Sequence, residues 1–214
     1  MSVTDFENAR WSASDQKVQF RHRAAADMIQ GGSVLDLGCG DGLLFELLGS
    51  KIERGLGLDI SPEAVHKARE KGFEALVHSF DEPLPLEDDS FDYAVLLDVL
   101  EHVYDPVPLL REAGRVAKEV IVGVPNFSSL PARLQVLLGQ VPENNSPHKG
   151  HIYWFNHSVL RRVAKQAGVR IAELRMNTFS PASLFGDALV QAAPNLLALS
   201  FVARMPKEEE RDIV

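Results

Sequence analysis

The chain has 214 residues, which suits one α/β domain with room for an inserted lid or a terminal extension. Its 22 Lys and Arg against 30 Asp and Glu give a formal charge of −8, which argues against nucleic acid as the main partner because phosphate backbones bind clustered basic side chains. No apolar run reaches the roughly 18 residues of a membrane span and no secretory signal pattern is visible, so we expect a cytoplasmic protein.

Apolar segments alternate with helical patterns after a helix that we predict from about Ser14 to Gln30. Seven segments are predicted as strands: 33–37, 54–59, 73–78, 91–97, 119–124, 169–175 and 196–203. Helices are predicted over 43–48, over 61–72, from 105 onward and over 156–168, and helix is slightly favoured for the ambiguous stretch 183–193. Strands this apolar, separated by helices, predict an α/β protein whose parallel sheet is covered on both faces.

The chain divides into an N-terminal helical segment (1–32), a main domain (33–206) and a charged tail (207–214). Residues 125–150 interrupt the rhythm of strands and helices with a short amphipathic piece and then a polar run. Long loops within compact domains are usually functional or disordered, so we interpret this one as an inserted lid or substrate loop.

A glycine-rich turn follows the first predicted strand and carries three glycines, namely Gly38, Gly40 and Gly42. Glycines there let the backbone turn tightly and approach a ligand, beside the unpaired N–H groups of a helix N-terminus. Asp59 ends the next strand, where an acid typically binds the ribose of an adenosine. The spacing departs from the dinucleotide pattern Gly-x-Gly-x-x-Gly, and the flanking Asp36 and Asp41 would disfavour a pyrophosphate but suit an ammonium group. No Gly-Lys-Ser/Thr follows, so a P-loop is also disfavoured.

Residues 34–42 (Val-Leu-Asp-Leu-Gly-Cys-Gly-Asp-Gly) resemble motif I of class I S-adenosylmethionine-dependent methyltransferases, and the resemblance extends over about 33–204. Residues 124–127, 132–135 and 137–139 are similar to the methionine biosynthesis protein MetW, whereas 98–103 and 150–155 look more like small-molecule methyltransferases of the ubiquinone-pathway type. The resemblance implies a Rossmann-like, doubly wound sheet of seven strands, mostly parallel with an antiparallel last strand. It also implies S-adenosyl-L-methionine as the cofactor and S-adenosyl-L-homocysteine as the product.

The resemblance further implies a set of cofactor-binding residues: Asp36, Gly38, Cys39, Gly40, Gly42, Asp59, Ile60, Ser79, Phe80, Asp81, Leu97 and Asp98. Within this set, Asp36 would lie near the amino group of the methionine moiety, Asp59 would hold the ribose, and Ile60 would pack on the adenine. The family often has Gly-Asp after the third strand, but this chain reads His-Ser-Phe-Asp-Glu over 78–82. Asp81 is therefore the candidate for the adenine amino group, beside the alternative of an ordinary loop acid.

Two histidines are candidates for acceptor chemistry: His102 after the fourth strand, and His151 in the aromatic segment after the lid. A near-neutral pKa suits His102 as a general base, although a structural hydrogen-bonding role is the interpretation that we place ahead of it. His151 matches a histidine that often precedes an aromatic pair in such methyltransferases, which implies a place near the substrate. The histidines of 148–157 fit no zinc-ligand spacing, so no metal site is predicted. Trp154 and Phe155 are assigned to core packing.

Two further features belong to the same interpretation. The single cysteine, Cys39, excludes an internal disulfide, and we interpret it as buried filler under the glycine turn. The N-terminal segment with Trp11 and Arg21 is a candidate to fold over the cofactor, so that Arg21 or Arg23 would meet the methionine carboxylate. The alternative for these arginines is a solvated helix face.

The expected function is methyl transfer to a small-molecule acceptor, with O-methylation slightly ahead of N- or C-methylation. Because the sulfonium is already an activated electrophile, the protein mainly has to align the acceptor and exclude water. The similarity to MetW keeps a second hypothesis open, in which the chain is a non-catalytic partner of a homoserine acyltransferase in methionine biosynthesis. A protein partner or a homodimer is compatible with either hypothesis, and a dehydrogenase is disfavoured by the glycine spacing.

Overall fold

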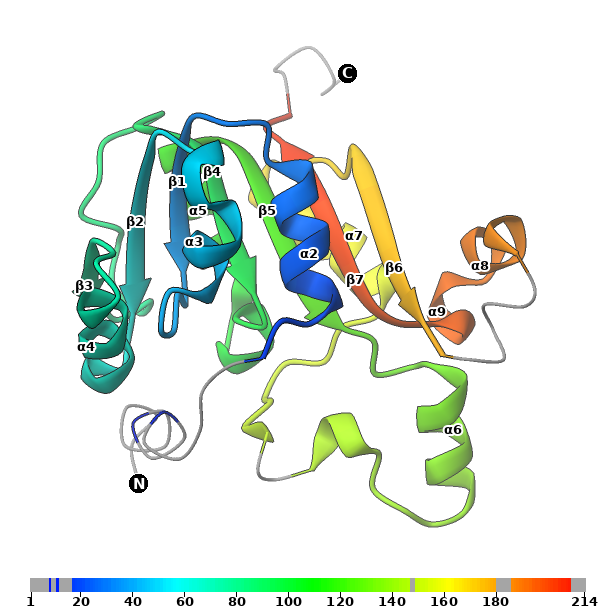
Figure 1. Cartoon of the computed structure of the whole chain (residues 1–214). Helices are drawn as coiled ribbons and strands as arrows, with labels where there is room; N and C mark the ends of the chain where they lie inside the picture. Colours follow the sequence, from blue (N-terminus) through cyan, green and yellow to red (C-terminus); the bar gives the residue numbers. More distant parts are fainter. Residues whose placement is uncertain (1–7, 9–10, 12–16, 147–148, 180–185, 209–214) are drawn as a thin grey trace.

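A seven-stranded sheet runs through the molecule in the order β3-β2-β1-β4-β5-β7-β6 (Figure 1). The structure, a computed structural model, describes residues 8, 11, 17–146, 149–179 and 186–208. Its strands are β1 (Ser33–Leu37), β2 (Arg54–Asp59), β3 (Ala75–Val77), β4 (Phe91–Leu97), β5 (Ala117–Pro125), β6 (Glu173–Thr178) and β7 (Ala198–Pro206). The first five strands are parallel, and β7 is antiparallel to both of its neighbours. The predicted mostly parallel sheet with an antiparallel last strand is therefore confirmed.

Helices cover both faces of this sheet, as the prediction required. Figure 1 shows α2 (Phe20–Met28) and α3 (Leu43–Leu48) in front of the sheet, with α5 (Pro106–Val116) and α7 (His157–Ala167) behind it. Three more helices lie at the edges: α4 (Pro62–Glu70) packs beside β2 and β3, while α8 (Asp187–Ala192) and α9 (Pro194–Leu197) lead into β7. Within the described ranges, no helix is both long and apolar enough to cross a membrane.

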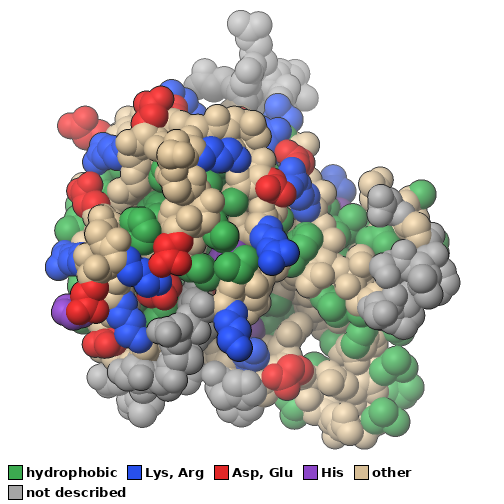
Figure 2. Space-filling model, viewed as in Figure 1, with side chains coloured by type: hydrophobic (Ala, Val, Ile, Leu, Met, Phe, Trp, Pro, Cys, Tyr) green, Lys and Arg blue, Asp and Glu red, His purple; other side chains and the backbone are tan. Residues whose placement is uncertain are grey.

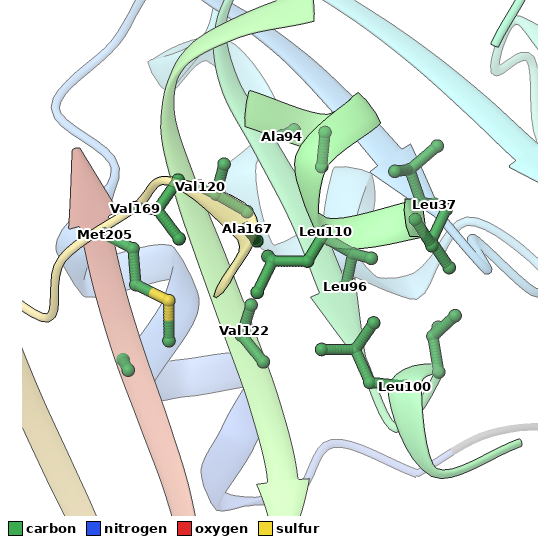
Figure 3. Close-up of a cluster of buried hydrophobic side chains, with 14 of the residues drawn as sticks. Leu37, Ala94, Leu96, Leu100, Leu110, Val120, Val122, Ala167, Val169 and Met205 are labelled. Carbon is green, nitrogen blue, oxygen red and sulfur yellow. The ribbon is translucent and has the colours of Figure 1, made fainter. Parts of the chain in front are cut away.

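Side chains of the central strands alternate between two apolar layers, because successive residues of a strand point to opposite faces. On β4, Leu96 enters the layer beneath α5 and α7, and Val95 enters the layer beneath α2 and α3. Figure 3 shows the first layer, where Leu110 of α5 lies among Leu96 and Val122 of the sheet. Burial on both faces explains why these strands read as nearly continuous apolar runs.

The predicted helix boundaries are set by capping residues. The Ser61 hydroxyl accepts a hydrogen bond from the Ala64 N–H at 3.2 Å, and the Asn156 side chain accepts one from the Val159 N–H at 2.9 Å. At the other end of α7, Gly168 adopts the left-handed conformation with φ of 80°. These capping residues explain why α4 and α7 start, and α7 ends, where the sequence indicates.

Several boundaries differ from the prediction. The N-terminal helix begins at Phe20, because Gln19 is extended with φ of −117° and ψ of 172°, and residues 14–16 lie outside the described part of the chain. The sixth strand begins four residues later than expected. Residues 169–172 make only single contacts to the end of β7, such as the Arg170 N–H bond to the Pro206 carbonyl at 3.1 Å.

Three further boundaries are shifted by a few residues. β3 covers 75–77 rather than 73–78, β5 extends to 117–125, and β7 runs over 198–206 instead of 196–203. The stretch assigned to helix contains α8 over 187–192, and its first residues lie outside the described part. In the predicted tail, Lys207 forms an isolated antiparallel bridge with Val169, and residues 209–214 are outside the description.

The predicted lid, residues 125–150, leaves the sheet at the carboxyl end of β5; we call it the insertion. It contains α6 (Leu130–Leu137) and the short 3-10 turn η3 (Glu143–Asn145), and Figure 1 shows α6 at the lower right, below the carboxyl end of β5. Its base is held by Asn126, whose fully buried side-chain amide donates to the Ala198 carbonyl at 2.7 Å and to the Asn195 carbonyl at 3.1 Å. The insertion is therefore anchored beside the expected ligand edge.

Candidate cofactor and acceptor site

A cavity of about 260 Å³ lies at the carboxyl ends of β1, β2, β3 and β4. Ligands of open α/β sheets bind at this edge. Most of the predicted cofactor-binding residues line the cavity: Asp36, Gly38, Cys39, Asp59, Ile60, Ser79, Phe80, Asp81, Leu97 and Asp98. Gly40 and Gly42 lie behind this lining, within the turn. The structure therefore brings the four strand ends of the prediction to one place.

Asp59 ties the glycine turn to β2. Its Oδ2 accepts the Gly40 N–H at 2.9 Å, and its Oδ1 accepts the Ser61 N–H at 2.8 Å. The Gly38 N–H donates to the Leu58 carbonyl at 2.7 Å. An ionised carboxylate has about four lone-pair directions. Asp59 thus holds the turn while its carboxylate lines the cavity.

Two glycines of the turn are required by packing as well as by conformation. Gly38 has φ of 81°, and a Cβ there would come within 2.4 Å of the Val99 Cγ2 atom. Gly42 has φ of 82°, and a Cβ there would meet the Phe73 ring at 2.5 Å. Gly38 therefore leaves room for the Val99 side chain at the cavity wall. Gly42 leaves room for the Phe73 ring against the turn.

Asp36 lies in β1, just before the glycine turn, and lines the cavity. Its burial, and secondarily the charge of Asp59, raises the pKa of Asp36 to about 8. The expectation that Asp41 also flanks the ligand is wrong, because Asp41 is directed to Lys71, with Nζ and Oδ2 2.7 Å apart. Burial raises the pKa of the Cys39 thiol well above its usual value, which keeps the thiol neutral and agrees with its interpretation as filler.

The N-terminal segment contributes Trp11, Arg21 and His22 to the cavity wall. The Arg21 guanidinium contacts Asp98, with Nη2 and Oδ2 2.9 Å apart, while its Nε is buried and contacts no hydrogen-bond acceptor among the described residues. Burial, followed by the charge of Arg21, lowers the pKa of His22 to about 4, so this ring is neutral. Arg23 is exposed, which makes Arg21 the arginine of the two that faces the cavity.

Asp98 is held in an unusual backbone conformation at the end of β4. Its φ is 56°, a region that non-glycine residues rarely adopt, and its N–H donates to the Gly123 carbonyl at 3.0 Å. Such strain persists where the surrounding structure enforces it, commonly at ligand sites. The conformation directs the Asp98 side chain into the cavity, toward Arg21.

The two predicted histidines meet at the other end of the cavity. His102 lies in the 3-10 turn η2 (Leu100–His102) and lines the cavity, and its ring lies 4.8 Å from that of His151 in an edge-to-face arrangement. The Nδ1 atom of His151 is 2.8 Å from the Asn144 carbonyl, and its Nε2 is 3.9 Å from Oε1 of the fully buried Glu101. His151 therefore stands behind His102 rather than in the cavity lining.

Backbone hydrogen bonds explain how the aromatic segment reaches this corner. The N–H groups of Ile152 and Tyr153 donate to the Glu101 carbonyl at 2.9 and 3.0 Å. Phe155 is fully buried as predicted, but Trp154 is 61% exposed, so its assignment to the core is wrong. The run is irregular rather than helical there, and neighbouring side chains point to different sides. His148 lies outside the described residues.

Several cavity residues were not predicted, namely His22, Leu44, Val99, Val103, Tyr104 and Ile152. Val99 follows Asp98 directly, so its place could have been inferred from the end of β4. Ile152 reaches the cavity only through the Glu101 backbone contact, for which no sequence pattern exists.

The sheet order, the antiparallel β7 and the glycine turn opposite Asp59 together define the fold of class I S-adenosylmethionine-dependent methyltransferases. The family model described as methionine biosynthesis protein MetW matches residues 20–178, so the chain belongs to that family. Both results confirm the predicted superfamily and its MetW-like character.

Known proteins similar to the chain are named for methionine biosynthesis and for methyl transfer. It is 30% identical over 168 residues to the bifunctional methionine biosynthesis protein MetXA/MetW of Rhodopirellula baltica, covering 73% of this chain and 26% of that protein. It is 28% identical over 165 residues to the ubiquinone biosynthesis O-methyltransferase of Thiobacillus denitrificans, covering 72% and 71%. In several relatives the match spans only 26%, 34% or 40% of their length.

Among solved structures, the chain is similar to magnesium protoporphyrin IX methyltransferase from Synechocystis PCC 6803 with bound SAH. The TM-score is 0.65 at 19% identity, with 96% of this chain and 95% of that chain covered. At this identity, the likeness establishes the shared fold.

Proposed function

We propose that the chain transfers a methyl group from S-adenosyl-L-methionine to a small-molecule acceptor, with oxygen as the favoured nucleophile. The observation that supports this most is that one cavity joins the carboxylates of Asp36 and Asp59 to the imidazole of His102. The similarity to a protein named as an O-methyltransferase, over about seven-tenths of both chains, supports oxygen as the acceptor atom.

The residues present fit the charges and shape of this cofactor. The buried Asp36 carboxylate gains a counter-charge from an ammonium group, and the buried Arg21 Nε offers a donor for a carboxylate. Asp59 would accept from the ribose hydroxyls, while Ile60 and Phe80 present apolar surface for the adenine. Asp81 and Ser79 line the same end, and the backbone of Gly38, Cys39, Gly40 and Gly42 would face the methionine part.

The cofactor supplies a methyl group on a sulfonium, which needs no covalent enzyme nucleophile. The chain's own residues then have two tasks, to orient the acceptor and to accept its proton. Leu97 and Asp98 border the space between the glycine turn and His102. We assign the acceptor's proton to the paired imidazoles of His102 and His151. His102 lines the cavity, and the His151 ring contacts the His102 ring edge-to-face.

The experiment is a calorimetric titration of the intact, tag-free protein with S-adenosyl-L-methionine, followed by a screen of hydroxylated acceptors for release of S-adenosyl-L-homocysteine. Asp59→Asn should weaken cofactor binding, whereas the matched variant Asp27→Asn, on the outer face of α2, should leave it unchanged. If the intact protein does not bind the cofactor, the proposal is wrong.

The second candidate function is a non-catalytic partner of a homoserine acyltransferase. Membership of the MetW family supports it, and so does the relative whose name joins MetXA to MetW. An exposed apolar surface on α6 and just after it also supports it, made by Leu134, Val136, Leu137, Leu138 and Val141. Figure 2 shows apolar side chains gathered over α6, and contiguous exposed apolar surface commonly marks a protein interface. Cofactor binding without turnover, together with co-purification of an acyltransferase, would favour this function over methyl transfer.

A further inference from the structure

We propose that Glu101, His102 and His151 form a binding site for a divalent transition-metal ion at the acceptor end of the cavity. The site itself requires only these three side chains, whereas the role that we give to the ion rests on the proposed methyl transfer. Each residue offers one ligand atom, and these atoms lie within 4.8 Å of one another.

The separations suit a common ion. Two ligand atoms bound to one ion through bonds of about 2.0–2.2 Å lie roughly 3–3.5 Å apart. The Nε2 atom of His151 and Oε1 of Glu101 are 3.9 Å apart, which is too long for a hydrogen bond and close to the spacing across an ion. Side-chain rotations that move each ligand atom by less than about 1 Å would bring all three atoms to bonding distance from one ion.

The tautomer of His151 is fixed in the way that metal ligands require. The Asn144 carbonyl can only accept, so the Nδ1 atom 2.8 Å away carries the proton. In a neutral ring, Nε2 then directs its lone pair toward Glu101. Histidine ligands almost always donate their other N–H to a carbonyl or carboxylate in this manner. The Phe127 ring, 5.5 Å from that of His151 and edge-to-face, restricts the imidazole to this orientation.

Burial adds an electrostatic argument. Glu101 is fully buried, and a carboxylate in such a place favours a positive charge close by. A metal ion between Glu101 and the two imidazoles supplies that charge. A proton on His151 Nε2 is the competing occupant, and it predicts no metal binding.

The donor set indicates the class of ion. Two imidazole nitrogens and one carboxylate oxygen suit zinc, cobalt, iron(II) or manganese, whereas magnesium and calcium favour oxygen ligands. Three protein ligands leave coordination positions open. Because His102 lines the cavity, these positions face the space assigned to the acceptor.

An ion at this position points to an acceptor with two neighbouring oxygen donors, one of them a hydroxyl. The ion lowers the pKa of that hydroxyl, so a proton is released to solvent at neutral pH. The oxygen then bonds to the methyl carbon, and the carbon–sulfur bond breaks with its electron pair remaining on sulfur. With the ion bound, the two imidazoles serve as ligands, and release of the proton to solvent replaces the proton transfer to these imidazoles proposed above for the metal-free protein.

The test uses the full-length, tag-free protein after treatment with a chelator. Co²⁺ alone is titrated and followed by its visible absorption, and Zn²⁺ is titrated by calorimetry. We expect one equivalent of each ion, with cobalt bands typical of nitrogen and oxygen ligands. His151→Ala and His102→Ala should weaken binding more than about 100-fold, beyond the range for loss of a residue that only hydrogen-bonds to a metal ligand. Thermal unfolding of each variant checks that it is folded.

The matched control is His66→Ala. His66 and Glu70 form an exposed pair on α4, with ring nitrogen and carboxylate oxygen 3.6 Å apart, so they provide the same residue types away from the cavity. Less than one equivalent bound to the wild-type protein, or equal affinity in the His151→Ala and His66→Ala variants, would overturn the proposal. Cofactor binding is measured on the chelated protein in parallel. If it persists while the metal titration is flat, only the metal site is lost; if metal binds and the cofactor does not, only the proposed function is lost.

Discussion

Asp36→Asn is expected to stabilise the fold and to weaken cofactor binding at the same time. Burial, and secondarily the charge of Asp59, raises the pKa of Asp36 from 3.8 to about 8. In the unfolded chain the group ionises at its ordinary pKa, so at neutral pH folding has to take up a proton. Asparagine matches the neutral carboxyl in shape and takes up no proton. It cannot offer the negative charge that an ammonium group requires.

The gain in free energy of unfolding in Asp36→Asn follows from the difference between the unfolded-state and folded-state pKa values of Asp36. Neutral pH lies about three units above the ordinary pKa, and each unit is worth about 1.4 kcal/mol, which sets an upper bound of about 4 kcal/mol at pH 7. Because the folded-state pKa is the higher one, the contribution of Asp36 to stability falls as pH rises from about 4 to about 8. The advantage of the variant should therefore be near zero at pH 4 and grow across that window.

Urea unfolding at several pH values between about 4 and 8 measures this difference as a shift in midpoint with an unchanged slope. Asp92→Asn is the control, expected to be less stable than the wild type by a constant amount across this pH range. A hydrogen bond from Lys118, followed by hydrogen bonds from Ser33, lowers the pKa of Asp92 to about 2. The ionised Asp92 carboxylate therefore stabilises the fold above pH 3.8, and this stabilisation is lost as pH falls through 2. Because the side chain is 35% exposed, the stabilisation is worth about 1 kcal/mol or less. An Asp36→Asn variant that is less stable at pH 7, or a difference independent of pH, would refute the reasoning.

Three other variants test the packing around the cavity and the insertion. Gly38→Ala should lose about 1–3 kcal/mol in thermal unfolding, because its Cβ would lie 2.4 Å from Val99 at φ of 81°; an unchanged midpoint would contradict this. Asp98→Ala should be less stable than Asp98→Asn by about 1 kcal/mol in denaturant titrations, since alanine tolerates φ of 56° less well than asparagine, and both lose the charge pair with Arg21. Leu137→Ser should change stability by less than about 0.5 kcal/mol, because this side chain is 81% exposed; in pull-down experiments it should reduce capture of an acyltransferase if the partner function holds.

The cofactor end of the cavity could be predicted because its determinants are local. The glycine turn follows β1 directly, and Asp59 is the last residue of the neighbouring strand, so parallel pairing alone brings them together. The position of the Asp41 side chain could not be predicted in this way. Asp41 lies in the same turn, but Lys71 from the end of α4 draws its side chain away from the ligand edge.

The acceptor end could be predicted only in part, because it depends on contacts between distant segments. His102 follows β4, whereas His151 follows the insertion, and the Glu101 carbonyl joins the two segments. The proposed metal site combines Glu101 and His102 from one segment with His151 from another, so the spacing of histidines within 148–157 could not predict it. The burial of Trp154 and Phe155 also could not be predicted from residue type. Both are aromatic, but only Phe155 faces the core in this irregular stretch.

We expect the cavity at the carboxyl ends of β1, β2, β3 and β4 to bind S-adenosyl-L-methionine. The most direct measurement is calorimetry with the intact, tag-free protein, comparing wild type with Asp36→Asn and Asp27→Asn. We expect saturable binding at one site, weakened by Asp36→Asn and unchanged in Asp27→Asn. No binding by the wild-type protein, or equal binding by all three, would contradict it.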